Sequence, residues 1–323
     1  MEDNKLKVIE LFGGIGACSK ALERLGIDYE IVDYVEIDKY AVNSFNAIHS
    51  TNFELQDICK WDKNIEVDLI MHGSPCQDFS LAGLQAGGDA GSGTRSSLMY
   101  ETIRIVKKLK PKYVIWENVK NLLGDKHRHN FDNYLKIMEE LGYKSYYKVL
   151  NAKDYGIPQN RERVFTISIR NDIEKEFIFP TPIPLKLKLK DILDDNADEK
   201  YYMSSDKLNS IANWKCFEKP LTKVCGRESI VRTLTTHCGA ESGGLITYCE
   251  QLDNTTNLQD YCLNKESGLR IRKITPKEAW KLMGFDKEDF EKASKVTPNS
   301  QLYKQAGNSI VVNVLEAIMK KLF

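Results

Sequence analysis

Short apolar runs alternate with amphipathic stretches along the first half of the chain. The apolar runs predict strands at about residues 7–12, 31–37, 68–72, 112–116, 143–149 and 164–169. Apolar residues at helical spacing predict helices at about residues 18–25, 38–48, 97–109 and 131–141. Strands that alternate with helices form βαβ units. We therefore expect an α/β fold with a mostly parallel sheet and helices on both faces.

The alternation weakens after the proline-rich segment 180–184, and residues 185–269 show no clean periodicity. Helical patterns return at 275–283, with Pro276 at the first helical position, and at 311–322. The chain is therefore predicted to contain a main domain at 1–179 and a smaller irregular domain at 180–297. Residues 298–323 are predicted to return to the main domain.

Charge changes this picture, because the net charge is zero but is unevenly distributed. The chain has 46 Lys and Arg against 46 Asp and Glu, which excludes a generic basic DNA-coating protein but not a nucleic-acid enzyme. Residues 1–90 carry 7 basic and 16 acidic side chains, whereas residues 91–170 carry 16 and 8. Segment 171–263 is again acidic and 264–323 basic. From charge alone, chance unevenness of the solvated surface is the favoured interpretation of this pattern.

The cysteines and apolar runs bear on compartment and metals. The eight cysteines form no CxxC pair, so neither a zinc ribbon nor a redox motif is expected, and we predict no metal. No apolar run approaches the roughly 20 residues of a membrane span, and no signal peptide is apparent. We expect a cytoplasmic protein with reduced cysteines.

The first candidate site is a glycine cluster between a strand and a helix. Gly13, Gly14 and Gly16 occupy the position of a nucleotide-binding turn, but Ser19 breaks the GxGxxG pattern of NAD enzymes. Glu36, at the end of the next strand, is placed to bind ribose hydroxyls. A tight turn beside a surface carboxylate is an equally good interpretation of these residues alone.

Three further clusters occur at strand ends. Cys76 follows the third strand within Ser74–Ser80, and Glu117 ends the fourth. Open α/β sheets place their chemistry at these ends, although a lone cysteine is more often structural. Arg161 and Arg163 enter the sixth strand two residues apart, a spacing that suits a carboxylate and a carbonyl. Singly, each arginine has a surface-charge interpretation.

Together, these motifs resemble the DNA (cytosine-5) methyltransferase family of bacterial and phage type, which uses S-adenosylmethionine (AdoMet). The segments that match, in family order, are Glu10–Gly16, Glu36–Asp38, Asp57, Ser74–Ser80, Glu117–Val119, Gln159–Arg163, Arg272–Glu278 and Gln305–Ser309. The resemblance covers nearly the whole chain except about 180–269. It implies a Rossmann-like AdoMet-dependent methyltransferase domain, with target recognition in the smaller domain.

The resemblance also implies a mechanism. The Cys76 thiolate would add to C6 of a flipped-out cytosine in a specific double-stranded DNA sequence, and C5 would then take the methyl group of AdoMet. Glu117 would hold the N3/N4 edge of the base. Arg161 and Arg163 would orient Glu117 and contact the cytosine O2.

The remaining implied roles concern cofactor, DNA and partners. The cofactor-binding residues would be Phe12, Gly14, Gly16, Glu36, Ile37, Asp57, Pro75, Leu98 and Asn308. DNA contacts would come from Gln77, Ser80 and Arg95. Arg95 lies within a loop at 83–97 that is expected to be mobile, and Ser80 lies before it. The product would be S-adenosylhomocysteine, and no metal is implied. The protein would act as a monomer on duplex DNA, near the nucleoid or from a phage genome. A cognate restriction endonuclease would act separately.

One departure and three rival functions remain. Lys281 stands where the family usually has Arg, which changes packing or phosphate binding there.

A tRNA cytosine-5 methyltransferase shares the catalytic motifs but carries Cys-Phe-Thr, whereas this chain has Glu218 after Cys216-Phe217. A non-catalytic DNA-binding regulator would not need the intact catalytic motifs. A NAD oxidoreductase lacks a use for Pro75-Cys76-Gln77.

Overall fold

The computed structural model describes residues 5–75, 98–204, 206, 224–238, 247–249 and 271–323. Two compact units share the chain. The first comprises residues 1–151, 162–182 and 310–323, and the second comprises 152–161 and 183–309. The second unit thus includes residues 152–161 and ends at residue 309. The domains predicted from the sequence, 1–179 and 180–297 with 298–323 returning to the first, stay a prediction.

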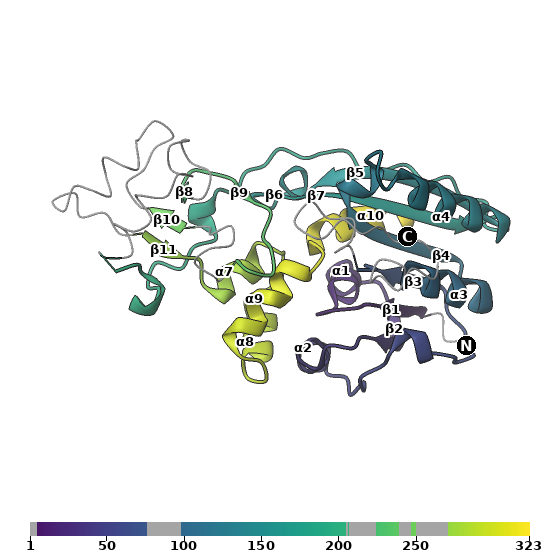
Figure 1. The fold of residues 1–323 in the computed structure, drawn as a ribbon, viewed down its shortest axis with the longest axis horizontal. Helices are drawn as coiled ribbons and strands as arrows, with labels where there is room; N and C mark the ends of the chain where they lie inside the picture. The colour runs from purple at the N-terminus through teal and green to yellow at the C-terminus, as the bar shows by residue number, and fades with distance from the viewer. Residues whose placement is uncertain (1–4, 76–97, 205, 207–223, 239–246, 250–270) are drawn as a thin grey trace. The chain divides into compact units, whose positions relative to one another are not determined.

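The first unit is built on a six-stranded mixed sheet with the order β2-β1-β3-β4-β7-β5. The first four strands in this order are parallel, and β7 runs antiparallel to both β4 and β5. This confirms the predicted α/β class with a mostly parallel sheet (Figure 1). The strands are β1 Leu6–Leu11, β2 Tyr29–Val35, β3 Leu69–His72, β4 Tyr113–Val119, β5 Tyr143–Asn151 and β7 Glu162–Arg170.

Helices pack on both faces of this sheet, as the strand alternation requires. Ile9 and Leu11 of β1 point into the core cluster formed with α3 and α4, whereas Glu10 points to the other face and contacts Ser19 of α1. Helix α10 packs against α1. The helices of this unit are α1 Ala17–Arg24, α2 Lys39–His49, α3 Met99–Leu109, α4 Arg128–Glu140 and α10 Val312–Leu322, with 3₁₀ turns η1 Ile58–Lys60 and η3 Lys120–Leu123.

The second unit has short strands and a helical cluster. Its strands are β6 Gln159–Asn160, β8 Val224–Gly226, β9 Val231–Arg232, β10 Thr247–Cys249 and β11 Ile271–Lys273. Its helices are α7 Pro276–Lys281, α8 Lys287–Ser294 and α9 Asn299–Asn308, with 3₁₀ turns η4 Ala152–Tyr155, η5 Leu189–Asp191 and η6 Glu199–Tyr201. Strands β11, β10 and β8 form one sheet, and β6 pairs with β9.

Local capping explains where two helices begin. The Asp38 carboxylate accepts a hydrogen bond from Tyr40 N at 2.9 Å and starts α2, as predicted. Helix α7 starts with a capping box, in which Thr275 and Glu278 exchange hydrogen bonds and Pro276 takes the first helical position. Helices α8 and α9 were not predicted, and α9 packs against α7 and α8. These contacts explain why residues 298–309 group with the second unit.

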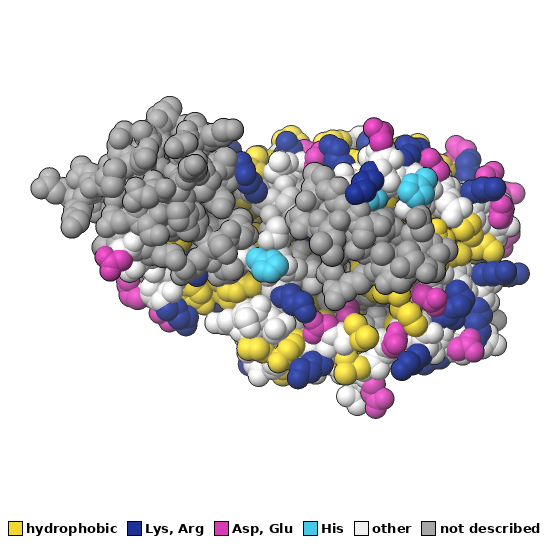
Figure 2. Space-filling view, in the orientation of Figure 1, with side chains coloured by type: hydrophobic (Ala, Val, Ile, Leu, Met, Phe, Trp, Pro, Cys, Tyr) yellow, Lys and Arg dark blue, Asp and Glu magenta, His cyan; other side chains and the backbone are white. Residues whose placement is uncertain are grey.

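Surface charges on the first unit are mixed rather than of one sign. Figure 2 shows Lys and Arg side chains interspersed with Asp and Glu around α3, α4 and the neighbouring strands. Several of the basic residues in segment 91–170 are ion-paired, including Lys120–Glu162, Arg128–Asp132 and Lys144–Glu176. Exposed pairs of this kind contribute little stability, but they occupy some of the basic side chains of this segment.

Candidate active site and cofactor site

The predicted motifs of the first unit meet at one edge of its sheet. Leu11 of β1 pairs with Val35 of β2 and with His72 of β3, and His72 pairs with Trp116 of β4. All four strands are parallel, so the residues that follow these positions share one edge. The order β2-β1-β3 also makes the gap between β1 and β3 a topological switch point, where open α/β sheets bind ligands.

The glycine turn after β1 depends on glycine for two different reasons. Gly16 has φ +80°, and a Cβ there would lie 2.2 Å from His49 Nε2, so no side chain fits. Gly14 has φ +56° but nothing lies within 4 Å of the Cβ position, so open space borders this part of the turn. The Tyr34 hydroxyl donates to Gly14 O at 2.7 Å and fixes the turn. Phe12 also has a positive φ, +53°, which is strained for a side-chain residue.

Glu36 closes the other side of this turn. Its carboxylate accepts hydrogen bonds from Gly14 N at 3.2 Å and from Ile37 N and Asp38 N, both at 2.9 Å. Burial raises the pKa of Glu36, and the three backbone donors oppose that shift. The neighbouring Ile37 side chain is 72% exposed, which is unusual for isoleucine. A carboxylate and an exposed apolar side chain thus stand together at the end of β2.

Asp57 is tied to the end of β2 by a buried carboxylate. Asp57 caps the 3₁₀ turn η1 by accepting from Cys59 N at 3.0 Å. The preceding Gln56 donates to Asp33 Oδ1 and to Tyr34 O, both at 2.7 Å. Asp33 is only 2% exposed and also accepts from Trp61 Nε1 at 2.7 Å. Asp33 therefore fixes the segment on both sides of Asp57 relative to the Glu36 strand end.

Glu10 is a second buried carboxylate, beneath the glycine turn. It accepts hydrogen bonds from Ser19 N at 3.0 Å and from the Ser19 hydroxyl. Burial raises the pKa of Glu10 to about 7, since these bonds only partly compensate for lost hydration. The charge of Glu10 therefore changes near neutral pH.

The segment that leads to Cys76 is held by β4. Trp116 Nε1 donates to Ser74 Oγ at 2.9 Å, and Asn118 Nδ2 donates to Ser74 O at 3.4 Å. A Cβ on Gly73 would lie 3.7 Å from Glu117 Oε2. The backbone three residues before Cys76 therefore lies beside the Glu117 carboxylate.

Glu117 forms an ion pair with Arg163. Arg163 Nε lies 3.1 Å from Glu117 Oε1, and the two side chains are only 17% and 12% exposed, respectively. Arg163 also donates from Nη1 to Glu162 O at 2.8 Å. The prediction that Arg161 and Arg163 orient Glu117 stays a prediction; the structure shows the contact of Arg163 with this carboxylate. This contact leaves Oε2 of Glu117 on the side of Gly73.

Arg161 and Asn308 lie in the second unit. Arg161 is 3% exposed, and its guanidinium donates to three backbone carbonyls, Leu234 O at 2.8 Å, Gly307 O at 3.0 Å and Ser309 O at 2.7 Å. Asn308 is the last residue of α9 and is exposed. The two arginines of the motif are thus engaged differently, since Arg163 holds a carboxylate and Arg161 holds backbone.

The other predicted site residues divide into two groups. Pro75 and Leu98 are half-buried, and Leu98 packs against the main core cluster. Cys76, Gln77, Ser80 and Arg95 lie outside the described residues, as does Cys216-Phe217-Glu218.

Lys281, the departure from the family pattern, has a structural role. Its ammonium donates to Ile192 O at 3.1 Å and to Asp194 Oδ1 at 2.9 Å. Asp194 N in turn donates to Glu278, which forms a buried pair with Arg272. Lys281 therefore anchors the segment around residues 192–194 to α7.

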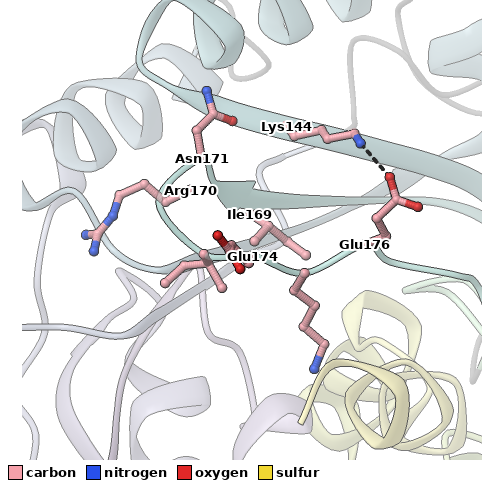
Figure 3. A pocket seen from close by; sticks show the side chains of 8 residues that line it. Lys144, Ile169, Arg170, Asn171, Glu174 and Glu176 are labelled. Atoms are coloured by element: carbon pink, nitrogen blue, oxygen red, sulfur yellow. Dashed lines mark hydrogen bonds and ion pairs between the residues drawn. The ribbon is translucent and has the colours of Figure 1, made fainter.

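The described part of the chain holds a cavity of about 340 Å³ at the opposite end of the sheet (Figure 3). It is lined by Lys144, Ile169, Arg170, Asn171, Ile173, Glu174, Lys175 and Glu176. Ile169 pairs with Tyr113, whereas Arg163 pairs with Val119, so about 20 Å of strand separates this cavity from the Arg163 side chain. Two of these lining residues, Lys144 and Glu176, form an ion pair at 3.0 Å.

Sequence reasoning missed Asp33, the position-fixing contacts of Gln159 and the buried His72. His72 stacks on Trp116 with ring centroids 5.6 Å apart. No sequence signal marks His72, because it ends an otherwise apolar strand. Asp33 interrupts the apolar run of β2 and could have been recognised as a buried acid.

Among the described residues, no helix is long and apolar enough to cross a bilayer. The same residues contain no cluster of three or more His, Cys, Asp or Glu that could hold a metal.

Comparison with known proteins identifies the family. The sequence model of C-5 cytosine-specific DNA methylases matches residues 6–323. The chain is 34% identical to the type II methyltransferase M2.ScrFI of Lactococcus lactis subsp. cremoris, covering 98% of this chain and 99% of that one. It is 32% identical to the orphan methyltransferase M.SPRI of Bacillus phage SPR, covering 98% and 97%.

Solved structures show the same fold at lower identity. The Entamoeba histolytica methyltransferase EhMeth superposes with a TM-score of 0.79 at 20% identity, covering 99% of this chain and 98% of that one. The S. pombe Dnmt2 methyltransferase gives 0.76 at 20% identity, covering 98% and 97%. With a family model matched from residue 6 to the end, the chain belongs to the C-5 cytosine-specific DNA methylases and is a DNA cytosine-5 methyltransferase.

Proposed function

We propose that this protein transfers a methyl group from AdoMet to C5 of a cytosine flipped out of a specific double-stranded DNA sequence, through a covalent bond between Cys76 and C6. The observation that carries the proposal is the Glu117–Arg163 pair beside Gly73, at the edge where the sheet's parallel strands end. The Glu117 carboxylate lies beside Gly73, which precedes Cys76 by three residues.

The residues around the glycine turn fit AdoMet. The open space at Gly14 admits a ligand close to the backbone, and the Glu36 carboxylate is an acceptor for ribose hydroxyls. The exposed Ile37 side chain offers an apolar surface for an adenine ring. The proposed binding residues are Phe12, Gly14, Gly16, Glu36, Ile37, Asp57, Pro75, Leu98 and Asn308. When bound, AdoMet supplies an electrophilic methyl group on a sulfonium.

The protein side chains prepare the cytosine for methyl transfer. The Cys76 thiolate adds to C6, and the electron pair displaced toward N3 is met by a proton held by Glu117. Arg163 fixes Glu117 so that this proton lies at N3. C5 is then nucleophilic and gains the methyl group. Solvent takes the C5 proton, the C5–C6 double bond re-forms, and the Cys76 thiolate leaves with its electron pair. The N3 proton returns to Glu117, which restores the starting state.

Duplex DNA is the proposed partner, with Gln77, Ser80 and Arg95 as contacts. The target base must leave the helix because Cys76 has no access to C6 within the stack. We propose that the protein acts as a monomer and needs no metal, and that any cognate endonuclease acts separately.

Bisulfite sequencing tests this function. The chain is expressed in a host without cytosine methylation, and genomic DNA is sequenced beside DNA from a Cys76→Ser control. Methylated cytosines in one sequence context, absent from the control, are expected. Purified protein is also given labelled AdoMet with either duplex DNA or tRNA, because tRNA cytosine-5 methyltransferases share the catalytic motifs. Label in tRNA alone, or full activity of Cys76→Ser, would overturn the proposal.

A further inference from the structure

Arg161 joins two segments that are far apart in the sequence. Its three carbonyl acceptors belong to Leu234, which follows β9, and to Gly307 and Ser309, at the end of α9. The guanidinium is almost fully buried, at 3% exposure. Bonds from a buried charged donor are stronger than neutral ones, and the planar fork of arginine fixes the direction of each.

Gln159 supports the same connection from two residues away. Its side-chain oxygen accepts from Leu234 N at 3.0 Å, and its side-chain nitrogen donates to Leu282 O at 2.8 Å. Around it, Val231 N donates to Pro158 O at 2.9 Å. Residues 231–238, which we call the β9 segment, are therefore bonded along residues 158–161.

The β9 segment and the end of α9 approach so closely that only glycine fits between them. A Cβ on Gly307 would lie 2.3 Å from Thr235 C and from Thr236 N. Both contacts are with backbone, so a side chain could be accommodated only by moving the segment. Arg161 bonds the two backbones at this point, on either side of Asn308.

We propose that Arg161 is a positioning residue that fixes the β9 segment against residues 307–309 at the end of α9. The part of the second unit that would contact DNA and the part that would contact AdoMet then keep a fixed arrangement. This inference rests on the proposed function, in which the second unit reads DNA and Asn308 contacts AdoMet. The exposed side chains that Arg161 positions are Thr235, His237 and Asn308. The effect of Arg161 on DNA binding then does not depend on the target base.

Two measurements test the proposal, with Arg161→Lys as the variant and Arg163→Lys as the matched control. The first is hydrogen exchange of the ligand-free proteins. Lysine keeps the positive charge but lacks the planar guanidinium that directs several hydrogen bonds at once. Arg161→Lys should therefore speed amide exchange in residues 231–238 and 307–310 and leave β1–β4 unchanged. The exchange measurement needs neither DNA nor AdoMet.

The second measurement uses two duplexes that contain the sequence found by bisulfite sequencing, one intact and one with an abasic site in place of the target cytosine. Arg161→Lys should weaken binding to both by the same factor, about tenfold. It should also raise KM for DNA more than it lowers kcat. Arg163→Lys should weaken binding only to the duplex that carries cytosine.

The outcomes separate the hypotheses. Unchanged amide exchange in residues 231–238 would overturn the positioning role. An affinity loss confined to the cytosine duplex would also overturn it and would assign Arg161 to the target base. A wild-type protein that methylates no DNA would instead overturn the proposed function, while the exchange data would still decide whether Arg161 holds the two segments.

Discussion

The Arg163 guanidinium is held against the Glu117 carboxylate by the antiparallel pairing of the strands that carry them. Glu117 of β4 pairs with Phe165 of β7, and Val119 pairs with Arg163. Arg163 is therefore a diagonal neighbour of Glu117 on the same face, within reach of a long side chain. The 3.1 Å contact from Nε to Oε1 follows from this register.

This geometry predicts that Arg163 contributes to catalysis largely through Glu117. Glu117→Gln and Arg163→Ala should each lower kcat by about 10²–10³. Residues that act as a unit are not additive, so the double variant should be little worse than Glu117→Gln alone. Single-turnover methyl transfer at saturating DNA measures the rates. Multiplication of the two single losses in the double variant would contradict the prediction.

The glycine turn offers a matched pair of substitutions. Gly16→Ala places a Cβ 2.2 Å from His49 Nε2 and adds backbone strain at φ +80°, whereas Gly14→Ala meets only the strain. We expect Gly14→Ala to lower the free energy of unfolding by about 1 kcal/mol and Gly16→Ala by about 3 kcal/mol or more. Urea titrations measure both. Equal losses would show that His49 moves away freely.

Gly14→Ala has a second expected effect, because its Cβ would enter the open space beside Glu36. Labelled AdoMet should bind Gly14→Ala more weakly despite the small loss of stability. Glu36→Ala should weaken AdoMet binding more than DNA binding. Equilibrium dialysis measures both affinities, and an unchanged AdoMet affinity in Glu36→Ala would count against the ribose contact.

The sequence predicted the sheet well and the helices of the second unit poorly, for physical reasons. Apolar runs mark β1, β3 and β4 because these strands are buried on both faces. Helix α9 buries Gln305 and Gly307 alongside Leu302, Tyr303 and Ala306, so polar and small residues interrupt the apolar pattern of its buried face. Its partner at Gly307 is the backbone of the β9 segment. Such close backbone contacts leave no hydrophobic pattern to read.

The candidate site shows the same division. Glu117 and Arg163 could be predicted because a carboxylate and a guanidinium have recognisable chemistry, and the register of their strands brings them together. The partners of Arg161 could not be predicted, since all three are backbone carbonyls that any residue would supply. Asp33 and Glu10 act through burial, which depends on neighbours that are distant in sequence.

Glu10 predicts a loss of stability as pH rises through neutrality. Its pKa is about 7 in the folded protein, against an ordinary value of 4.5, so the folded state binds the proton more tightly. The resulting stabilisation is fully present below pH 4.5 and is lost as pH rises through 7, by about 3 kcal/mol. Glu10→Gln, which cannot ionise, should therefore gain stability relative to wild type between pH 5 and pH 8. Urea unfolding at both values measures this difference, and a constant difference would show that Glu10 is ionised throughout.

His72 predicts the opposite dependence. It is fully buried against Trp116, and neither ring nitrogen has a hydrogen-bond partner among the described residues. Burial lowers the pKa of His72 to about 3 from an ordinary 6.5, so the unfolded chain binds the proton more tightly. Stability from the neutral ring is therefore present above pH 6.5 and falls as pH drops toward 3, by about 2 kcal/mol at pH 5.

His72→Phe keeps a ring to stack on Trp116 but removes the titrating group. The variant should lose little stability at pH 8 and should gain on wild type as the solution is acidified from pH 7 to pH 5. Chemical denaturation at each pH measures the difference, and NMR titration of the His72 ring protons reports its pKa directly. A ring that titrates near 6.5, with an unchanged stability difference between pH 7 and pH 5, would show that water reaches His72 in the folded protein.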